Sequence, residues 1–282
     1  MIKVVIADFD NTLYDWTGWF VQAFYLMAEK VARIIKKPFA DVLIEYQEFN
    51  RKHTNVEPAY STLALPCVIE RYPDKTWTEL KAIFEPAFKL FRGTRQEKLK
   101  LYPGVANTLK KIKARGITLV GCSDSTLESC QKRLTMLKID KYFTRMYVRE
   151  NSFICPIRSV PELPTVVREV SNTMRKPSPK LLLKICSEMG VSTEEVLYVG
   201  DSLSRDIGMA NLAGIKSVWA KYGSDLAHEL QQKLDVISFH SPADFKRLQR
   251  ILGGNTPCPD YVVKGFGGVI TAITKENELK KN

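Results

Sequence analysis

Two aspartates near the N-terminus are the residues best suited to do chemistry in this chain. Asp8 and Asp10 follow the apolar run Val4–Ala7, which predicts a buried strand. Side chains two residues apart point the same way along extended backbone, so both carboxylates converge on one place and repel each other. A divalent cation, a phosphoryl group or a shared proton relieves this repulsion. The pair therefore predicts a site that receives one of these.

Three more polar clusters stand where a sheet would bring them to the same edge. Ser123 and Asp124 follow a strand expected over Ile117–Cys122. Further on, a strand is expected over Val196–Gly200. Three acidic or hydroxyl residues follow this later strand, and a lysine precedes a predicted helix: Asp201, Ser202, Asp206 and Lys176. Ligands of open α/β sheets bind at the carboxyl ends of the strands, so these clusters and the first pair predict one shared site.

The elements that position these residues fall into two blocks. Residues 16–100 lack strand-like alternation, and an apolar stripe at helical spacing predicts a first helix: Trp19, Phe20, Ala23, Phe24, Met27 and Val31. Thr76, with Glu79 three residues on, predicts the start of a helix that runs to Phe91. From Tyr102 onward helices and strands alternate, which predicts a parallel sheet with helices on both faces. The first block therefore reads as an all-helical insertion.

Composition sets the class of protein. The 282 residues are 45% hydrophobic, as in an ordinary globular protein, and no apolar stretch approaches the roughly 20 residues that span a bilayer. Because Met1 leads at once into the first strand, we expect no cleaved secretory leader and a cytoplasmic protein. The six cysteines show no CxxC spacing and predict reduced thiols rather than a zinc site.

The net charge of +11 fits either attraction to nucleic acid or a phosphorylated substrate, or a solvated basic surface. No basic block is interleaved with aromatic residues. We therefore favour the solvated surface and expect neither a nucleic-acid partner nor a membrane.

The motifs taken together resemble those of the haloacid dehalogenase (HAD) superfamily of hydrolases. They are Asp8-Phe9-Asp10-Asn11-Thr12, then Ser123, Lys176-Pro177, and Gly200-Asp201-Ser202 with Asp206. The match covers residues 1 to about 220, and the helical block after Asp15 is similar to that superfamily's helical (C1-type) cap. The resemblance implies a Rossmann-like three-layer α/β core with a parallel sheet (residues 1–15 and 101–250), an inserted all-helical cap domain (16–100) and a C-terminal extension (251–282).

The expected chemistry is that of a Mg²⁺-dependent phosphatase acting on a small phosphomonoester. Asp8 would attack phosphorus and form an aspartyl-phosphate, and Asp10 would act as general acid and then as general base. Lys176 would neutralise the charge on Asp8 and on the phosphoryl group. The remaining expected roles are substrate binding (Thr12, Ser123 and Asp124), Mg²⁺ binding (Asp8, Asp201 and the carbonyl of Asp10) and support (Asp206 and Ser202). Asp206 would bind metal-bound water or orient Lys176.

Other interpretations remain open at this point. Ser123 and Asp201 could instead cap the helices that follow them, and Lys176 could be an ordinary exposed lysine. Asp10 favours phosphate esters over carbon–halogen bonds, since a halide leaves without a proton; the main alternatives are a phosphomutase, a dehalogenase-like hydrolase and a non-enzymatic binding module.

Substrate choice is expected to lie in the cap, but we assign none of the cap or cap-adjacent candidates to the site, since each also fits surface or packing: Tyr14, Trp16, Arg51, His53, Arg92 and Arg95. The segment 149–171 could also fold over the site, a hypothesis that rests on its position before Lys176.

Overall fold

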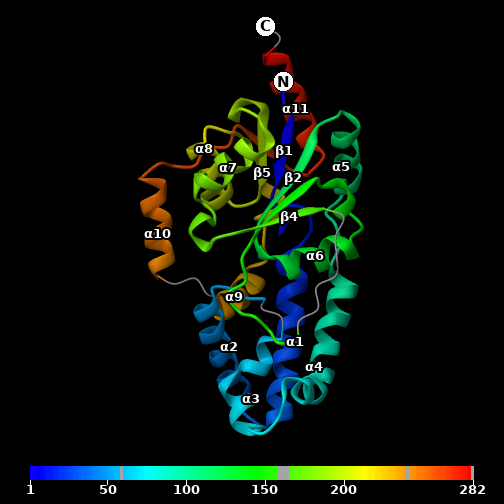
Figure 1. Cartoon of the computed structure of the whole chain (residues 1–282), viewed down its shortest axis with the longest axis vertical. Helices are drawn as coiled ribbons and strands as arrows, with labels where there is room; N and C mark the ends of the chain where they lie inside the picture. The colour runs from blue at the N-terminus through cyan, green and yellow to red at the C-terminus, as the bar shows by residue number, and fades with distance from the viewer. Residues whose placement is uncertain (58–59, 158–164, 239–241, 281–282) are drawn as a thin grey trace.

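The computed structural model describes residues 1–57, 60–157, 165–238 and 242–280. Seven parallel strands form one sheet in the order β4-β3-β2-β1-β5-β6-β7. This sheet lies in the half of the molecule that holds the N-terminus (Figure 1). The strands are β1 (Val4–Ala7), β2 (Thr118–Thr126), β3 (Arg145–Arg149), β4 (Val166–Val170), β5 (Val196–Gly200), β6 (Lys216–Ala220) and β7 (Tyr261–Val263). The chain builds outward from β1 to one edge and then returns to build the other edge from β5.

Helices cover both faces of this sheet, and others form a layer beyond the carboxyl ends of its strands. They are α1 (Trp16–Ile35), α2 (Phe39–His53), α3 (Pro66–Arg71), α4 (Trp77–Lys98), α5 (Val105–Ala114), α6 (Leu127–Met136), α7 (Pro179–Met189), α8 (Gly208–Leu212), α9 (His228–Ile237), α10 (Pro242–Leu252) and α11 (Gly268–Leu279). Because strand residues alternate between faces, Val5 packs with residues of α5, α6 and α11, whereas Ile6 packs with residues of α7 and α8. The predicted three-layer α/β core is confirmed.

The helices α1 to α4 lie together beyond the carboxyl ends of the strands, at the opposite end of the molecule from Met1 and α11 (Figure 1). The predicted apolar stripe of α1 is buried throughout, and α1 packs along α4. Thr76 and Glu79 form the predicted capping box at the start of α4, which continues to Lys98. An all-helical layer therefore stands over the edge of the sheet where the polar clusters end.

Two segments differ from the sequence-based expectations. Residues 251–282, for which no regular structure was expected, contain β7 and α11, which extend the sheet and one of its helical layers. The range 101–250, expected to be core, contains α9, which packs against α1 and α2. Tyr25 Oη donates to Lys233 O at 3.0 Å, and Asn50 Nδ2 donates to Ile237 O at 2.8 Å, so polar contacts fix α9 to the cap helices.

Smaller differences concern the strand ends. β2 runs four residues beyond the expected Cys122 and is bulged between Ser123 and Thr126. The helix expected over Arg205–Ala213 begins with a π-helical turn, η5 (Leu203–Ile207), before α8. Bulges and π-helical turns are irregularities that often re-aim side chains at functional sites, and hydrophobic periodicity does not reveal them.

Candidate active site

A cavity of about 290 Å³ lies at the carboxyl ends of β1, β2 and β5, beside the cap helices. Nearly all of the predicted site residues line it: Asp8, Asp10, Ser123, Asp124, Lys176, Asp201, Ser202 and Asp206. They come from four separate segments of the chain. The strand order explains the meeting, because β1 lies between β2 and β5 and all three run in the same direction.

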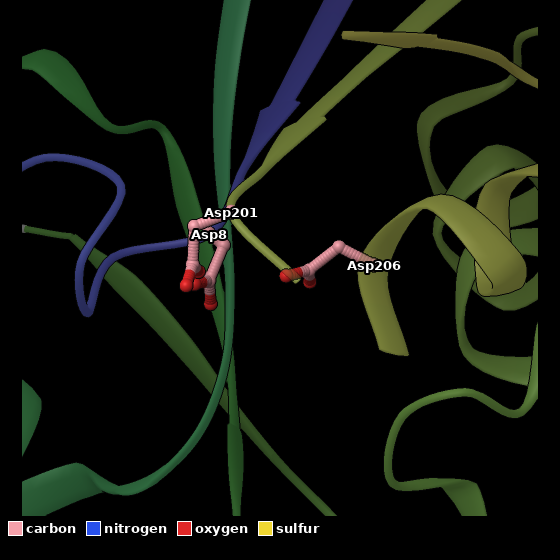
Figure 2. Close-up of side chains that lie close together, drawn as sticks. All are labelled: Asp8, Asp201 and Asp206. Carbon is pink, nitrogen blue, oxygen red and sulfur yellow. The ribbon is translucent and has the colours of Figure 1, made fainter. Parts of the chain in front are cut away.

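Three carboxylates meet on one side of this cavity. Asp8 and Asp201 lie side by side at the ends of neighbouring strands, and Asp206 points toward them from the following turn (Figure 2). One carboxylate oxygen from each of the three lies within 4.8 Å of the other two. Burial raises the pKa of Asp8 to about 7, where Lys176 opposes the rise and Asp206 and Asp10 add to it. Burial, with Asp206 and Asp8, also raises the pKa of Asp201 well above its ordinary value.

This crowding of negative charge fits a divalent cation. Hard cations bind carboxylate oxygens. The positive charge of such a cation would stabilise the ionised form of Asp201 and so oppose the burial and the neighbouring carboxylates that raise its pKa. The cluster combines Asp8 and Asp201, both predicted as ligands, with Asp206, for which the sequence left two roles open.

Lys176 is held inside the carboxylate cluster rather than exposed to solvent. Its Nζ lies 2.5 Å from Asp8 Oδ1 and 2.6 Å from Asp206 Oδ1, and 4% of its side chain is exposed. Asp206 in turn accepts from Tyr198 Oη at 2.7 Å and from Ser202 N at 3.0 Å. The alternative of an ordinary surface lysine is therefore wrong, and Asp206 holds Lys176 in place.

Asp10 is held from a direction that the sequence did not indicate. Its Oδ2 accepts hydrogen bonds from Ser125 Oγ at 2.7 Å and from Arg133 Nη2 at 3.1 Å. Its Oδ1 is buried and has no hydrogen-bond partner among the described residues. Oδ2 of Asp10 thus accepts two hydrogen bonds, whereas Oδ1 accepts none from the described residues.

Ser123 and Asp124 occupy the bulged end of β2. Ser123 Oγ accepts from Ser125 N at 3.1 Å, whereas α6 starts after Thr126, so Ser123 does not cap that helix. Asp124 Oδ1 accepts from Lys176 N at 3.3 Å, and its Oδ2 is paired with Arg205. Burial would raise the pKa of Asp124, but Arg205 and Lys176 outweigh it and keep this pKa below its ordinary value. Asp124 therefore fixes the backbone of Lys176 while it lines the cavity.

Thr12 lies behind the carboxylates rather than at the cavity wall. Its side chain is fully buried, and its Oγ lies 3.4 Å from Asp8 Oδ2 and 3.3 Å from Asp201 Oδ1. Ser202 caps η5, since its Oγ accepts from Arg205 N at 3.3 Å, so Asp201 is not the cap of that turn. The Thr12 hydroxyl therefore helps to position Asp8 and Asp201, and the Ser202 hydroxyl shapes the turn that carries Asp206.

Two further segments that line the cavity are ones that sequence reasoning did not connect with the site. They are the stretch after α2 and the α9 region, which contribute Asn55, Val56, Gln231, Leu234, Asp235 and Ser238. No motif marks them, because their place depends on how α9 packs against the cap. Within the segment 149–171, Arg149 lines the cavity, while Ser152 Oγ donates to His53 O at 2.7 Å. Residues 158–164 lie outside the described residues.

The six cap and cap-adjacent candidates lie in different environments. Trp16 lines the cavity, and Tyr14 is fully buried against Arg133. Arg51 is exposed, and the ring of His53 packs on Phe49. Arg92 and Arg95 line a different cavity, of about 110 Å³, between α1, α4 and α6.

The chain is similar in sequence to a known family of hydrolases and to individual phosphatases. A model of the haloacid dehalogenase-like hydrolases matches residues 2–214. The chain is 25% identical over 248 residues to the glyceraldehyde 3-phosphate phosphatase of Methanopyrus kandleri, which covers 85% of this chain and 92% of that protein. It is 30% identical over 232 residues to the phosphoglycolate phosphatase of Salmonella paratyphi A, which covers 79% of this chain and 82% of that protein.

Among solved structures, a 2-haloacid dehalogenase from Pseudomonas syringae pv. Tomato DC3000 aligns with a TM-score of 0.59 at 18% identity, over 98% of this chain and 99% of that one. At this identity the likeness shows a common fold. Within the described residues, no helix is both long enough and apolar enough to cross a bilayer.

Proposed function

Because the chain belongs to the haloacid dehalogenase-like hydrolases, we propose that it is a Mg²⁺-dependent phosphatase that hydrolyses a small phosphomonoester through an aspartyl-phosphate on Asp8. The phosphatase names of two relatives support the reaction class. The observation that carries the proposal is the pairing of a buried Asp8, in contact with Lys176, with a second carboxylate, Asp10, at the same cavity.

The two aspartates would divide the work. In the first step a carboxylate oxygen of Asp8 forms a bond to phosphorus while the bond to the leaving oxygen breaks, and Asp10 gives that oxygen its proton. In the second step Asp10 takes a proton from water, whose oxygen bonds to phosphorus and releases Asp8 and inorganic phosphate. Lys176 balances the charge of Asp8 as the phosphoryl group approaches, and Ser123 would contact a phosphoryl oxygen.

The carboxylate cluster would hold the metal ion. Asp8 and Asp201 would supply side-chain oxygens and Asp10 its main-chain carbonyl, a set of hard oxygen ligands that suits Mg²⁺. When bound, Mg²⁺ supplies positive charge that stabilises the phosphoryl oxygens.

Asp10 separates this proposal from carbon–halogen cleavage. A halide leaves without accepting a proton, whereas an alkoxide must be protonated as it leaves. Asp10 lines the cavity, and its Oδ1 accepts no hydrogen bond from the described residues, so this oxygen is available to give and take a proton. A phosphatase therefore fits better than a dehalogenase, although the fold is shared with one.

Turnover of a panel of phosphomonoesters tests the proposal directly. The panel would contain 4-nitrophenyl phosphate, phosphoglycolate, glyceraldehyde 3-phosphate, sugar phosphates and nucleotides, each with Mg²⁺ and with EDTA. We expect Mg²⁺-dependent release of phosphate from at least one ester. Isomerised sugar phosphate without phosphate release would indicate a phosphomutase, and no Mg²⁺-dependent turnover on any ester would refute the proposal.

Matched variants test the roles of the two aspartates. We expect Asp8→Asn to abolish turnover and Asp10→Asn to lower kcat for an alkyl phosphate by roughly 10²–10⁴-fold. Asp41→Asn is the control, because Asp41 is exposed on α2 and does not line the cavity. Turnover retained by Asp8→Asn would refute the nucleophile assignment while leaving phosphatase activity established.

A further inference from the structure

Arg133 is a fully buried cation that the chemistry described above does not use. It lies in α6, and none of its side chain is exposed. Its guanidinium makes three separate contacts: Nη2 donates to Asp10 Oδ2 at 3.1 Å, Nε donates to Tyr14 Oη at 3.0 Å, and Nη1 is paired with Glu57. A buried charge is costly unless it is paired and hydrogen-bonded. These contacts therefore confine the guanidinium to one position.

The contact with Asp10 distinguishes the two oxygens of that carboxylate. Oδ2 accepts from Arg133 and from Ser125 Oγ, whereas Oδ1 accepts no hydrogen bond from the described residues. A proton on Oδ2 would have to displace one of these donors, while a proton on Oδ1 displaces none. The arrangement thus favours Oδ1 as the oxygen that carries the proton.

The far side of Arg133 is linked to the wall of the active-site cavity through Glu57, which itself lines the separate cavity of about 110 Å³. Glu57 belongs to the stretch after α2, directly after Asn55 and Val56, which line the active-site cavity. Trp16, which also lines the cavity, donates its Nε1 to Glu57 Oε2 at 3.3 Å. Arg133 and Glu57 therefore connect two residues that line this cavity, Asp10 and Trp16.

We propose, on the basis of the function proposed above, that Arg133 is a positioning residue for Asp10. It holds the carboxylate by Oδ2 so that Oδ1 gives and takes the proton, and Glu57 fixes the other end of the guanidinium. Arg133 itself touches no reacting atom.

A comparison of leaving groups tests this role in the full-length protein with Mg²⁺. Nitrophenolate leaves without a proton, whereas an alkoxide needs one from Asp10. For Arg133→Gln we expect kcat for an alkyl phosphate to fall about 100-fold with little change in KM. With 4-nitrophenyl phosphate, the variant should release about one nitrophenolate per site in an initial burst and then turn over more slowly than the wild type, because the water that attacks the phosphoenzyme still needs Asp10.

Two further variants separate positioning from damage to the fold. The double variant Arg133→Gln/Glu57→Gln leaves no unpaired Glu57 and should show the same signature with cooperative thermal unfolding. Arg145→Gln is the matched control, because Arg145 is paired with Glu188 at the opposite end of β3 from the cavity, and we expect wild-type kinetics.

The outcomes are distinct. Wild-type kcat for the alkyl phosphate in the Arg133→Gln variant or in the folded double variant would overturn the inference. So would loss of the nitrophenolate burst in the folded double variant, since the defect would then precede proton transfer. Absence of wild-type turnover on every ester would refute the proposed function and this inference with it.

Discussion

Replacing Lys176 by Met should destabilise the protein strongly. Lys176 Nζ contacts both Asp8 and Asp206, at 2.5 and 2.6 Å, and all three side chains are buried. Removing one partner from a buried ion pair costs about 3–5 kcal/mol, because the remaining charges lose their compensation. Methionine keeps most of the apolar stem, so little of this loss comes from a cavity. At about 2 °C per kcal/mol for a chain of this length, Tm should fall by roughly 6–10 °C.

The loss should grow with pH. The pKa of Asp8 is raised to about 7, chiefly by burial and against the effect of Lys176, so it should rise further in the variant. A carboxyl group whose folded pKa is raised keeps its proton in the folded state, and it destabilises the fold as pH rises above its unfolded pKa. At about pH 5 Asp8 is protonated in both proteins and gains little from the lysine. At about pH 8 only the wild type pairs the ionised Asp8 with a cation, so the difference is larger.

Thermal unfolding in EDTA measures this effect without compensation by a bound divalent cation. Lys184→Met is the matched control, because Lys184 is 41% exposed on α7 and lies 3.8 Å from Glu188. We expect its Tm to stay within roughly 1 °C of the wild type, since exposed pairs contribute little. A Lys176→Met variant as stable as the wild type at about pH 8, or a loss that is equal at both pH values, would refute the reasoning.

Two further substitutions test how the fold supports the site and the sheet. In Gly223→Ala, the added methyl group would lie 1.8 Å from Asn11 O, so one of the two loops must shift. We expect the free energy of unfolding, measured in urea, to fall by about 1–3 kcal/mol and kcat to fall as well. An unchanged stability and kcat would contradict this packing argument. Asp260 accepts from Lys216 Nζ at 2.7 Å and from Ser217 N at 2.9 Å. Burial would raise its pKa, but these contacts keep it below the ordinary value. The contribution of Asp260 to stability is therefore complete above its unfolded pKa and is lost as pH falls through its folded pKa. Asp260→Asn should lower the free energy of unfolding by about 1–2 kcal/mol near neutral pH and by less in acid. Equal losses at the two pH values would contradict this prediction.

The sequence predicted those parts of the site that depend on local pattern. Asp8 and Asp201 follow short apolar strands, and parallel pairing of β1 with β5 brings them together. Lys176 could be placed only through the order of the motifs, because nothing in its own segment indicates that it is buried. The strands that escaped prediction lack a strong local signal: β7 has three residues, and β4 lies in a proline-rich segment.

The residues that support Asp10 could not be predicted, because their contacts depend on packing between distant segments. Arg133 is separated from Asp10 by 123 residues and lies in a short helix, where an arginine is ordinarily exposed. The position of Tyr14 beside the cap favours no burial, yet its side chain is fully buried against Arg133. Asn55 and Val56, just before Glu57, line the cavity beside α9, which packs against α2, and no local pattern indicates that position.

Chemical trapping of the phosphoryl group is the most direct test of the central claim that Asp8 is a covalent nucleophile. Turnover of an accepted phosphomonoester would be quenched in acid, any acyl phosphate reduced with borohydride, and the peptide that contains residue 8 analysed by mass. Asp10→Asn would be run in parallel, because it should slow hydrolysis of the intermediate. We predict reduction of Asp8 to homoserine in both proteins. Continued turnover with an unmodified Asp8 in both would contradict the account.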